Sequence, residues 1–194
     1  MMMTDIRIVD IDHFDYFAFR HLPVQTRSAG NPGGDGKKKY KDVETDMYLL
    51  MAEAESLQKE LTALIQKDAD GFEPLSKAYA MDKSHPNYDT VMEDWLRRAA
   101  ATPLEIMRLS CRMIELQRQF AEKGSVLAVS DAGTGVVFCW AAMYGGALNV
   151  LANTRLMKDR VYAARMNGEV EDLMNKYWKQ ADETYEFVFE KLKN

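Results

Sequence analysis

Cysteine and histidine are scarce in this sequence, which has 2 cysteines and 3 histidines among 194 residues. Neither cysteine belongs to a CxxC motif, and no histidine stands at a spacing that would let it share a metal ion with another ligand. Cys111 and Cys139 each fall within an apolar helical pattern, where a cysteine usually acts as a small buried hydrophobic residue. We therefore expect no disulfide and no metal site, but reduced packing thiols in a cytoplasmic protein.

An excess of positive charge is also lacking, because 30 acidic residues outnumber 25 basic ones and the net charge is -5. Nucleic-acid binding usually needs a broad positive field, so we expect no nucleic-acid partner. The first residues, MMMTDIRIVDIDHF, carry acids throughout and have no apolar core of signal-peptide length, so secretion is not indicated.

β-Strand patterns are almost absent. Outside IRIVDI, at residues 6–11, nearly every apolar residue recurs at a spacing of three or four, which is the helical period. The sequence therefore predicts an all-α bundle of about five helices. Its length predicts a single domain over residues 1–194, in which residues 1–36 form an atypical N-terminal segment.

Prolines, glycines and capping residues give the expected helix limits. Pro86 separates the first helix from the second, and ATPLE then starts a third, with Thr102 as its cap, Pro103 in the first helical position and Glu105 completing a capping box. Gly124 is expected to end that helix. The expected helices span about residues 42–81, 91–99, 103–124, 130–156 and 161–192.

The helix expected at residues 130–156 is apolar on nearly all sides and rich in glycine and alanine. Small residues let helices approach closely, so we expect it to be the central helix of the bundle. A membrane span is the competing interpretation, but Asn149 and Asn153 interrupt the apolar run, which favours a buried helix without a membrane partner.

Asp68 is out of place on the apolar face of the first helix, four residues after Leu64 and four before Phe72. An unpaired buried carboxylate either costs several kcal/mol or takes up a proton, and its pKa then rises toward the range useful for general acid–base catalysis. A salt bridge, or a cap on a neighbouring helix, is the alternative. Asp68 is one of two catalytic candidates.

Asp131 is the second catalytic candidate, in the stretch LAVSDAGTG at residues 127–135. An acid at a helix start complements the dipole and can cap backbone N–H groups, which is a purely structural interpretation. Gly133 and Gly135, however, leave the first turn without side chains, so a ligand could approach its N–H groups. Ser130 and Gly133 are therefore substrate-binding candidates.

Asn149 lies on the same helix face as Asp131, five turns later and about 27 Å along the axis. A small substrate could not touch both residues. Asn149 and Asn153 would instead bond between helices or subunits, or meet the far end of a long ligand. On this second interpretation Asn153 is a substrate-binding candidate.

The segment NPGGDGKKKY, residues 31–40, combines a glycine-rich turn with a basic run. Three lysines at a helix start oppose the dipole, and either a bound anion or simple solvation explains them. The turn could form an anion-binding nest of backbone N–H groups. The substrate-binding candidates here are Pro32, Gly33, Gly34, Lys37, Lys38, Lys39 and Tyr40.

Several stretches occur in an order that resembles the formimidoyltetrahydrofolate cyclodeaminase and methenyltetrahydrofolate cyclohydrolase family, including the C-terminal domain of the bifunctional formiminotransferase-cyclodeaminase. They are NPGGDG, KKKYKDVE, KDADGF followed by KAYAM, ATPLEIMRLS, AVSDAG and ALNVLANTRLMKD, and they cover about residues 31–160. Members of that family are all-helical, homodimeric enzymes that need no metal or redox cofactor. The resemblance therefore implies a homodimeric enzyme with no cofactor beyond its tetrahydrofolate substrate.

Two reactions are implied: hydrolysis of the 5,10-methenyl bridge to 10-formyltetrahydrofolate, or release of ammonia from a formimino group during ring closure. Both move protons, so Asp68 and Asp131 acquire a role, and we expect them to converge on one sheltered cavity wide enough for a pterin. The glycine-rich turn and the lysines would hold the pterin or the anionic glutamate tail. Hydrolysis is favoured, because no transferase is attached to supply a formimino substrate.

One departure from the family pattern concerns the N-terminal part. Similar members carry a P-G-G-G-S-type turn followed by an Ala/Gly-rich helix before the basic run, whereas here NPGGDG joins KKKY directly. A core helix is missing, unless a helix swapped from a partner restores it. The alternative function is therefore a catalytically silent helical protein that binds folate or a partner without turnover.

Overall fold

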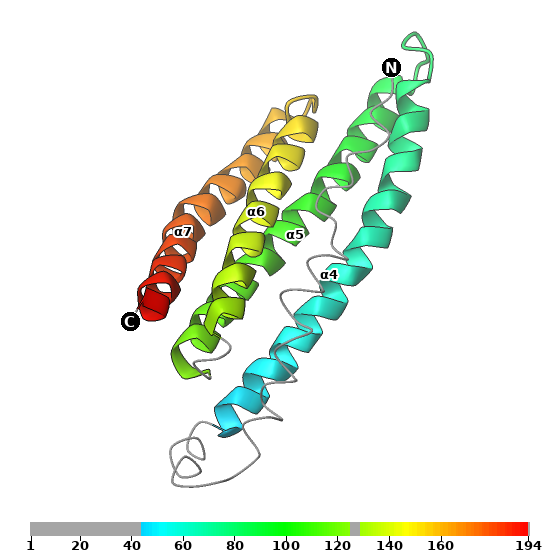
Figure 1. The fold of residues 1–194 in the computed structure, drawn as a ribbon. Coiled ribbons are helices and arrows are strands. Elements are labelled where there is room, and N and C mark those ends of the chain that lie inside the picture. Colours follow the sequence, from blue (N-terminus) through cyan, green and yellow to red (C-terminus); the bar gives the residue numbers. More distant parts are fainter. Residues whose placement is uncertain (1–43, 125–128, 194) are drawn as a thin grey trace, which may run out of the picture.

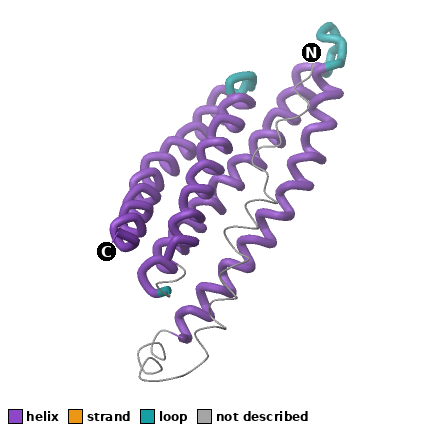
Figure 2. The backbone as a smooth tube through the Cα atoms, in the orientation of Figure 1, coloured by secondary structure: helices purple, strands orange, loops and turns teal. Residues whose placement is uncertain are grey.

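Four long helices form the part of the chain that the computed structural model describes, residues 44–124 and 129–193. They are α4 (Glu44–Tyr79), α5 (Tyr88–Lys123), α6 (Val129–Thr154) and α7 (Arg160–Lys193). Consecutive helices run antiparallel (Figure 1), and helix dominates the described chain (Figure 2). The predicted all-α bundle is confirmed, with four helices rather than about five within these ranges.

The count differs because α5 is one continuous helix where two were predicted. Thr102 and Pro103 are buried inside it. A proline inside a helix removes a backbone hydrogen bond and costs about 3 kcal/mol. Tight packing helps to offset this cost, because a β-carbon on Gly146 of α6 would lie 3.0 Å from the Pro103 carbonyl oxygen. The capping box is therefore wrong, and Glu105 instead pairs with Arg108 at 2.7 Å.

The other helix limits follow the sequence pattern. α5 ends at Gly124, as predicted, and the Gly124 N–H donates to the carbonyl oxygen of Phe120 at 2.9 Å. The ends of α4, α6 and α7 lie within two residues of their predicted positions. Apolar periodicity was sufficient to locate these ends because each helix buries one continuous face.

α5, and not α6, is the central helix of the described chain. It packs against each of the other three helices, whereas α6 packs chiefly on α5 and α7. Figure 1 shows α4 and α6 on either side of α5. The predicted central place of α6 is therefore corrected. Its small residues do allow close packing, but no described helix covers its other side.

α6 is long and apolar enough to cross a membrane by length and composition alone. However, 44% of its most apolar 18-residue window is buried, and the buried side contacts α5 and α7. Within the described ranges, this arrangement is that of a core helix with one side exposed.

Candidate functional site

Asp68 is half-buried on the side of α4 that packs against α5. No hydrogen-bond or ion-pair partner of its carboxylate is found among the described residues. Burial raises the pKa of Asp68 above the ordinary value of 3.8. Asp70, two residues later, is exposed and accepts a hydrogen bond from Gln66 Nε2 at 2.7 Å. Asp68 thus has the raised pKa that its place on the apolar face predicted.

Asp131 lies in the first turn of α6, half-buried, next to the exposed Ser130. Acidic residues are common in the first turn of a helix, because they complement the partial positive charge of its N-terminus. The two carboxylates therefore differ in surroundings: Asp68 lies on a helix face that packs against a neighbouring helix, whereas Asp131 lies at a helix N-terminus.

The glycines that follow Asp131 are packing residues. A β-carbon on Gly133 would lie 2.6 Å from Cγ1 of Val188 in α7, and one on Gly135 would lie 2.5 Å from Nε2 of Gln117 in α5. The space beside Gly133 is therefore filled by Val188, which corrects the interpretation that this glycine opens the helix to a ligand.

Asn149 and Asn153 share one flank of α6 with Asp131. Asn149 Nδ2 donates to the carbonyl oxygen of Gly145 at 2.8 Å, and Asn153 Nδ2 donates to that of Asn149 at 2.9 Å. Both amide nitrogens are thus used inside α6, and they do not make the bond between helices that was one of the expectations. Both side chains are half-buried, so the flank remains partly accessible.

The structure separates the two catalytic candidates along the bundle axis. Asp46 pairs with the last residue of α5 at 3.1 Å, and Gly135 lies against Gln117 near the same end of α5. α4 and α6 run in the same direction from that end (Figure 1). Asp131 precedes Gly135 by one turn, while Asp68 follows Asp46 by 22 residues, so the two carboxylates lie about 30 Å apart along the axis.

Asp68 and Asp131 therefore do not converge on one cavity within a single chain, contrary to the expectation from the sequence. Asn153 is 22 residues beyond Asp131, about 33 Å along α6, which places it level with Asp68. The predicted residues thus form two groups: Asp131 and Ser130 at one end of the bundle, Asp68 and Asn153 toward the other.

Gln117 is a polar residue that the sequence reasoning missed. Its side chain is 0% exposed, and neither Nε2 nor Oε1 has a partner among the described residues. Leaving a buried amide unpaired costs about 1–3 kcal/mol, so each such group calls for an explanation, a functional role among them. Gln117 lies four residues after Met113 and three before Phe120 on the apolar face of α5. The rule that identified Asp68 would have identified Gln117 as well.

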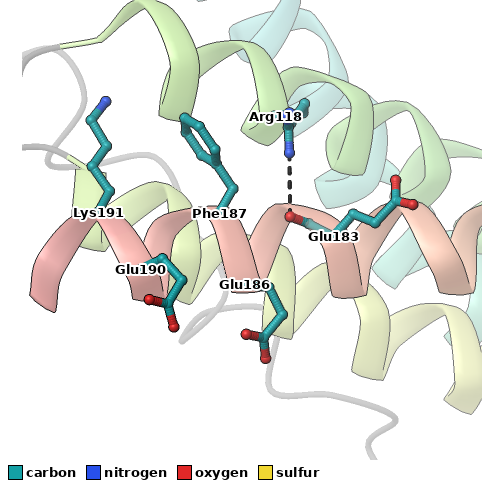
Figure 3. A pocket seen from close by; sticks show the side chains of 6 residues that line it. All are labelled: Arg118, Glu183, Glu186, Phe187, Glu190 and Lys191. Carbon is teal, nitrogen blue, oxygen red and sulfur yellow. Dashed lines mark hydrogen bonds between the residues drawn. The ribbon is translucent and has the colours of Figure 1, made fainter.

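A shallow depression of about 630 Å³ lies between α5 and α7 (Figure 3). Its cations are already used by the fold: Arg118 donates to the carbonyl oxygen of Glu183 at 3.2 Å, and Lys191 Nζ to that of Ala121 at 3.0 Å. None of the predicted site residues lines it, so the depression is not the candidate site. Its lining residues are Arg118, Glu183, Glu186, Phe187, Glu190 and Lys191.

The segment predicted to bind the pterin or the anionic glutamate tail is not part of the described chain. Its residues lie outside the described ranges; they are Pro32, Gly33, Gly34, Lys37, Lys38, Lys39 and Tyr40. Within the described ranges, no group of three or more His, Cys, Asp or Glu side chains is arranged to hold a metal ion.

Comparison with known proteins gives consistent matches. Residues 34–172 match the family described as Formiminotransferase-cyclodeaminase. A methenyltetrahydrofolate cyclohydrolase of Methylorubrum extorquens is 31% identical over 161 residues, which cover 81% of this chain and 77% of that protein. The formimidoyltransferase-cyclodeaminase of Mus musculus is 22% identical over 150 residues, and the match spans 75% of this chain but 28% of that longer protein.

A solved structure shares the fold. The crystal structure of formiminotetrahydrofolate cyclodeaminase from Thermotoga maritima superposes with a TM-score of 0.70, and the match covers 96% of each chain at 22% sequence identity. At this level of identity the likeness establishes the arrangement of helices and leaves the reaction to be argued from the site.

Proposed function

Because the chain belongs to the formiminotransferase-cyclodeaminase family, we propose that it acts on a one-carbon unit carried by tetrahydrofolate, as a methenyltetrahydrofolate cyclohydrolase. The cyclohydrolase relative supports water addition over ammonia release, because it is the more similar in sequence and is matched over most of its length.

The proposed reaction converts 5,10-methenyltetrahydrofolate and water to 10-formyltetrahydrofolate. A general base takes a proton from water while the water oxygen bonds to the bridging carbon. The bond from that carbon to N5 then breaks as N5 takes up a proton, and the hydroxyl group on the carbon loses its proton to become the formyl C=O, which stays on N10. One proton is released overall. The chemistry therefore needs one group that accepts a proton and one that donates a proton.

The observation that carries this proposal is the half-buried carboxylate of Asp68, which has no partner in the described part of the chain. Because burial raises its pKa, Asp68 holds a proton to higher pH than an exposed aspartate and can serve as the acid that protonates N5. Asp131, in the first turn of α6, is the proposed base that activates water.

Substrate binding is proposed for groups at both ends of the folate. A lysine run and a glycine-rich turn suit the anionic glutamate tail or the polar edge of the pterin, because ammonium groups and backbone N–H groups both bind anions. Ser130 and Asn153 would contact the substrate from α6. The residues proposed for the tail or pterin are Pro32, Gly33, Gly34, Lys37, Lys38, Lys39 and Tyr40.

We further propose a cytoplasmic homodimer that needs no cofactor beyond the folate substrate. The two free, buried thiols of Cys111 and Cys139 support a reducing compartment. The open side of α6 supports pairing between two copies. Neither nucleic acid nor membrane is a proposed partner.

Release of ammonia from a formimino group is the second candidate activity, favoured by the solved cyclodeaminase that shares the fold. In that reaction N10 attacks the formimino carbon, and a proton must reach the leaving nitrogen, so the same acid would serve. A shared acid explains why one scaffold could support either reaction.

Two assays on the purified full chain test the proposal. Loss of the methenyl absorbance measures hydrolysis, and ammonia release from formiminotetrahydrofolate measures the second activity. Asp131→Asn is expected to lower hydrolysis at least about 100-fold while the helical circular-dichroism spectrum is unchanged. Silence of the wild type in both assays, with folate still bound, would instead establish the catalytically silent protein.

A further inference from the structure

Gln117 places a fully buried amide in the core of the bundle at a cost in stability. Its side chain is 0% exposed, and neither Nε2 nor Oε1 has a hydrogen-bond partner in the described part of the chain. A leucine would fill nearly the same volume without the cost of an unpaired amide. Positions at which a protein gives up stability are often functional, so we expect the amide to serve the reaction or substrate binding.

α5 and α6 are antiparallel neighbours that keep one register over this part of the bundle (Figure 1). The amide of Gln117 lies at Gly135. Ten residues earlier on α5, the side chain of Met107 lies at Gly146, which is eleven residues later on α6. Because each helix rises about 1.5 Å per residue, the position one turn after Gln117 is level with the position one turn before Gly135.

Those two positions are occupied by Ala121 of α5 and Asp131 of α6. Residues four apart on a helix differ by only about 40° around its axis, so Asp131 turns toward the same side as Gly135. Ala121 is fully buried and contributes only a methyl group. The two polar side chains, Gln117 and Asp131, therefore lie diagonally across a patch of four residues whose other two members are small.

The spacing between the two polar groups suits one water molecule. Cβ atoms four residues apart on a helix are about 5–6 Å apart, and the amide atoms of Gln117 lie 2.5 to 3.1 Å from the β-carbon position of Gly135. The amide and the Asp131 carboxylate are thus on the order of 5–6 Å apart, which is the length of two hydrogen bonds of about 2.8 Å in series. Asp131 is half-buried, so substrate can approach from its side, while Gln117 closes the position from behind.

We propose, building on the proposed function, that Gln117 is a further catalytic residue, whose Oε1 accepts a hydrogen bond from the attacking water and holds that water against Asp131. The Asp131 carboxylate takes one proton of the water as the water oxygen bonds to the bridging carbon. The proton that faces Gln117 stays on the new hydroxyl group and leaves when the formyl C=O forms. Two acceptors fix the water so that a lone pair points at the carbon, and such orientation lowers the barrier.

An amide suits this task better than a carboxylate or an alkyl group. Its oxygen accepts a hydrogen bond without carrying a charge, so Gln117 does not compete with Asp131 for the proton. An ordered water needs at least two polar partners, which these two side chains supply. Nε2 of Gln117 still has no partner in the described part of the chain, so the cost in stability remains.

The two folate reactions differ in their need for this water. Hydrolysis uses water as the nucleophile, whereas in ammonia release N10 of the substrate is the nucleophile and no water is consumed. A residue that holds the water should therefore matter for hydrolysis, and much less for ammonia release or for folate binding.

The test is Gln117→Leu in the full-length protein. The kcat of methenyl hydrolysis should fall about 10- to 100-fold while KM stays within about twofold of wild type, because the lost contact is to the water and not to the folate. Any ammonia release by the wild type should be kept. Binding of tetrahydrofolate, followed by tryptophan fluorescence, and the circular-dichroism spectrum should be unchanged.

Ser110→Ala is the matched control. Ser110 is also 0% exposed, and its Oγ also has no partner among the described residues. It lies on the same side of α5 as Gln117 but seven residues earlier, about 10 Å farther from Asp131. Removing this buried polar atom should leave kcat for hydrolysis at the wild-type value.

The pattern of losses decides the role of Gln117. Loss of hydrolysis in Gln117→Leu but not in Ser110→Ala supports it. Hydrolysis by Gln117→Leu at the wild-type rate, a raised KM alone, or an equal loss of hydrolysis and ammonia release overturns it. If Gln117→Leu does not fold, Gln117→Met removes the same oxygen from a side chain of similar length. Failure of both variants to fold also overturns the proposal, because the amide would then be a structural group.

Failure of the proposed function gives a different result. A wild type that does not hydrolyse methenyltetrahydrofolate overturns the proposed function and the role of Gln117 together. An active wild type beside an equally active Gln117→Leu protein overturns only the role of Gln117.

Discussion

Gly135 of α6 lies directly against the side-chain amide of Gln117 on α5: a β-carbon added to Gly135 would come within 2.5 Å of Nε2 and 2.7 Å of Cδ. Gln117 is fully buried, and its amide has no hydrogen-bond partner among the described residues. The contact therefore sets the distance between the two helices and holds an unpaired polar group at the Asp131 end of α6.

Gly135→Ala is expected to destabilise the protein by about 1–3 kcal/mol, because the new methyl group must displace the Gln117 amide from a packed interface. Urea denaturation measures the change. Gly168→Ala is the matched control: nothing lies within 4 Å of its β-carbon position, so higher helix propensity should stabilise it by about 0.5–1 kcal/mol. Equal effects of the two substitutions on the free energy of unfolding would contradict the tight contact between Gly135 and Gln117.

Gln117→Leu is expected to stabilise the fold by about 1–2 kcal/mol, because it removes an unpaired buried amide at nearly constant volume. Thermal and urea unfolding both report the gain. Gln66→Leu serves as the control, since Gln66 is exposed and donates to Asp70 at 2.7 Å, so that removing its amide should give no gain. A Gln117→Leu protein less stable than the wild type would mean that the native amide is in fact paired.

Much of the fold could be predicted from local sequence because apolar residues repeat with the helical period. The end of α5 at Gly124 and the limits of α6 followed from this period and from glycine chemistry. The continuation of α5 through Pro103 could not be predicted in this way. The close contact that helps to offset the cost of the proline is made with Gly146, which is distant in sequence. Local rules for proline assume that no such contact exists.

The site was predicted less completely than the fold. Asp68 could be identified because a carboxylate on an apolar stripe is visible in the sequence, and its surroundings raise its pKa as expected. Its distance from Asp131 could not be predicted, because it depends on how α4 and α6 align along α5. That alignment is set by contacts between helices, such as Asp46 with Lys123 and Gly135 with Gln117.

Asp68→Asn is expected to stabilise the protein at neutral pH, provided that the fold is otherwise unchanged. Burial raises the folded pKa of Asp68 above 3.8, so the folded state holds its proton more tightly than the unfolded chain. The contribution of the Asp68 carboxyl to the free energy of unfolding is therefore fully present below pH 3.8. It is lost as the pH rises through the pKa of Asp68 in the folded state. The advantage of the variant should therefore vanish below about pH 3.8, as urea denaturation at a series of pH values would measure. An advantage that stays constant over this pH range would contradict the assignment to the buried carboxylate.

Neither thiol is expected to react with a thiol reagent in the native protein at pH 8. Cys111 and Cys139 are buried in the interface of α5 and α6, and burial raises the pKa of Cys111 to about 12 and that of Cys139 also upward. The reactive thiolate is therefore scarce as well as shielded. Titration with Ellman's reagent should find both thiols only after denaturation, and rapid native labelling would contradict the described packing.

Asp159 caps α7, and its replacement should show the opposite pH behaviour to that of Asp68. Its Oδ1 accepts a hydrogen bond from the Tyr162 N–H at 3.0 Å, and its Oδ2 accepts one from Arg97 at 2.7 Å. The Tyr162 N–H, followed by Arg97, lowers the pKa of Asp159 below 3.8, so its stabilisation is present above that pH and is lost as the pH falls through the folded pKa. Asp159→Ala should therefore lower the melting temperature at pH 7, and the difference from wild type should shrink as the pH falls below 3.8.

Asp172→Ala, an exposed substitution within the same helix, should leave the melting temperature nearly unchanged. If the difference in melting temperature between Asp159→Ala and wild type stayed constant down to low pH, the substitution would have removed a packing contact and not a charged cap.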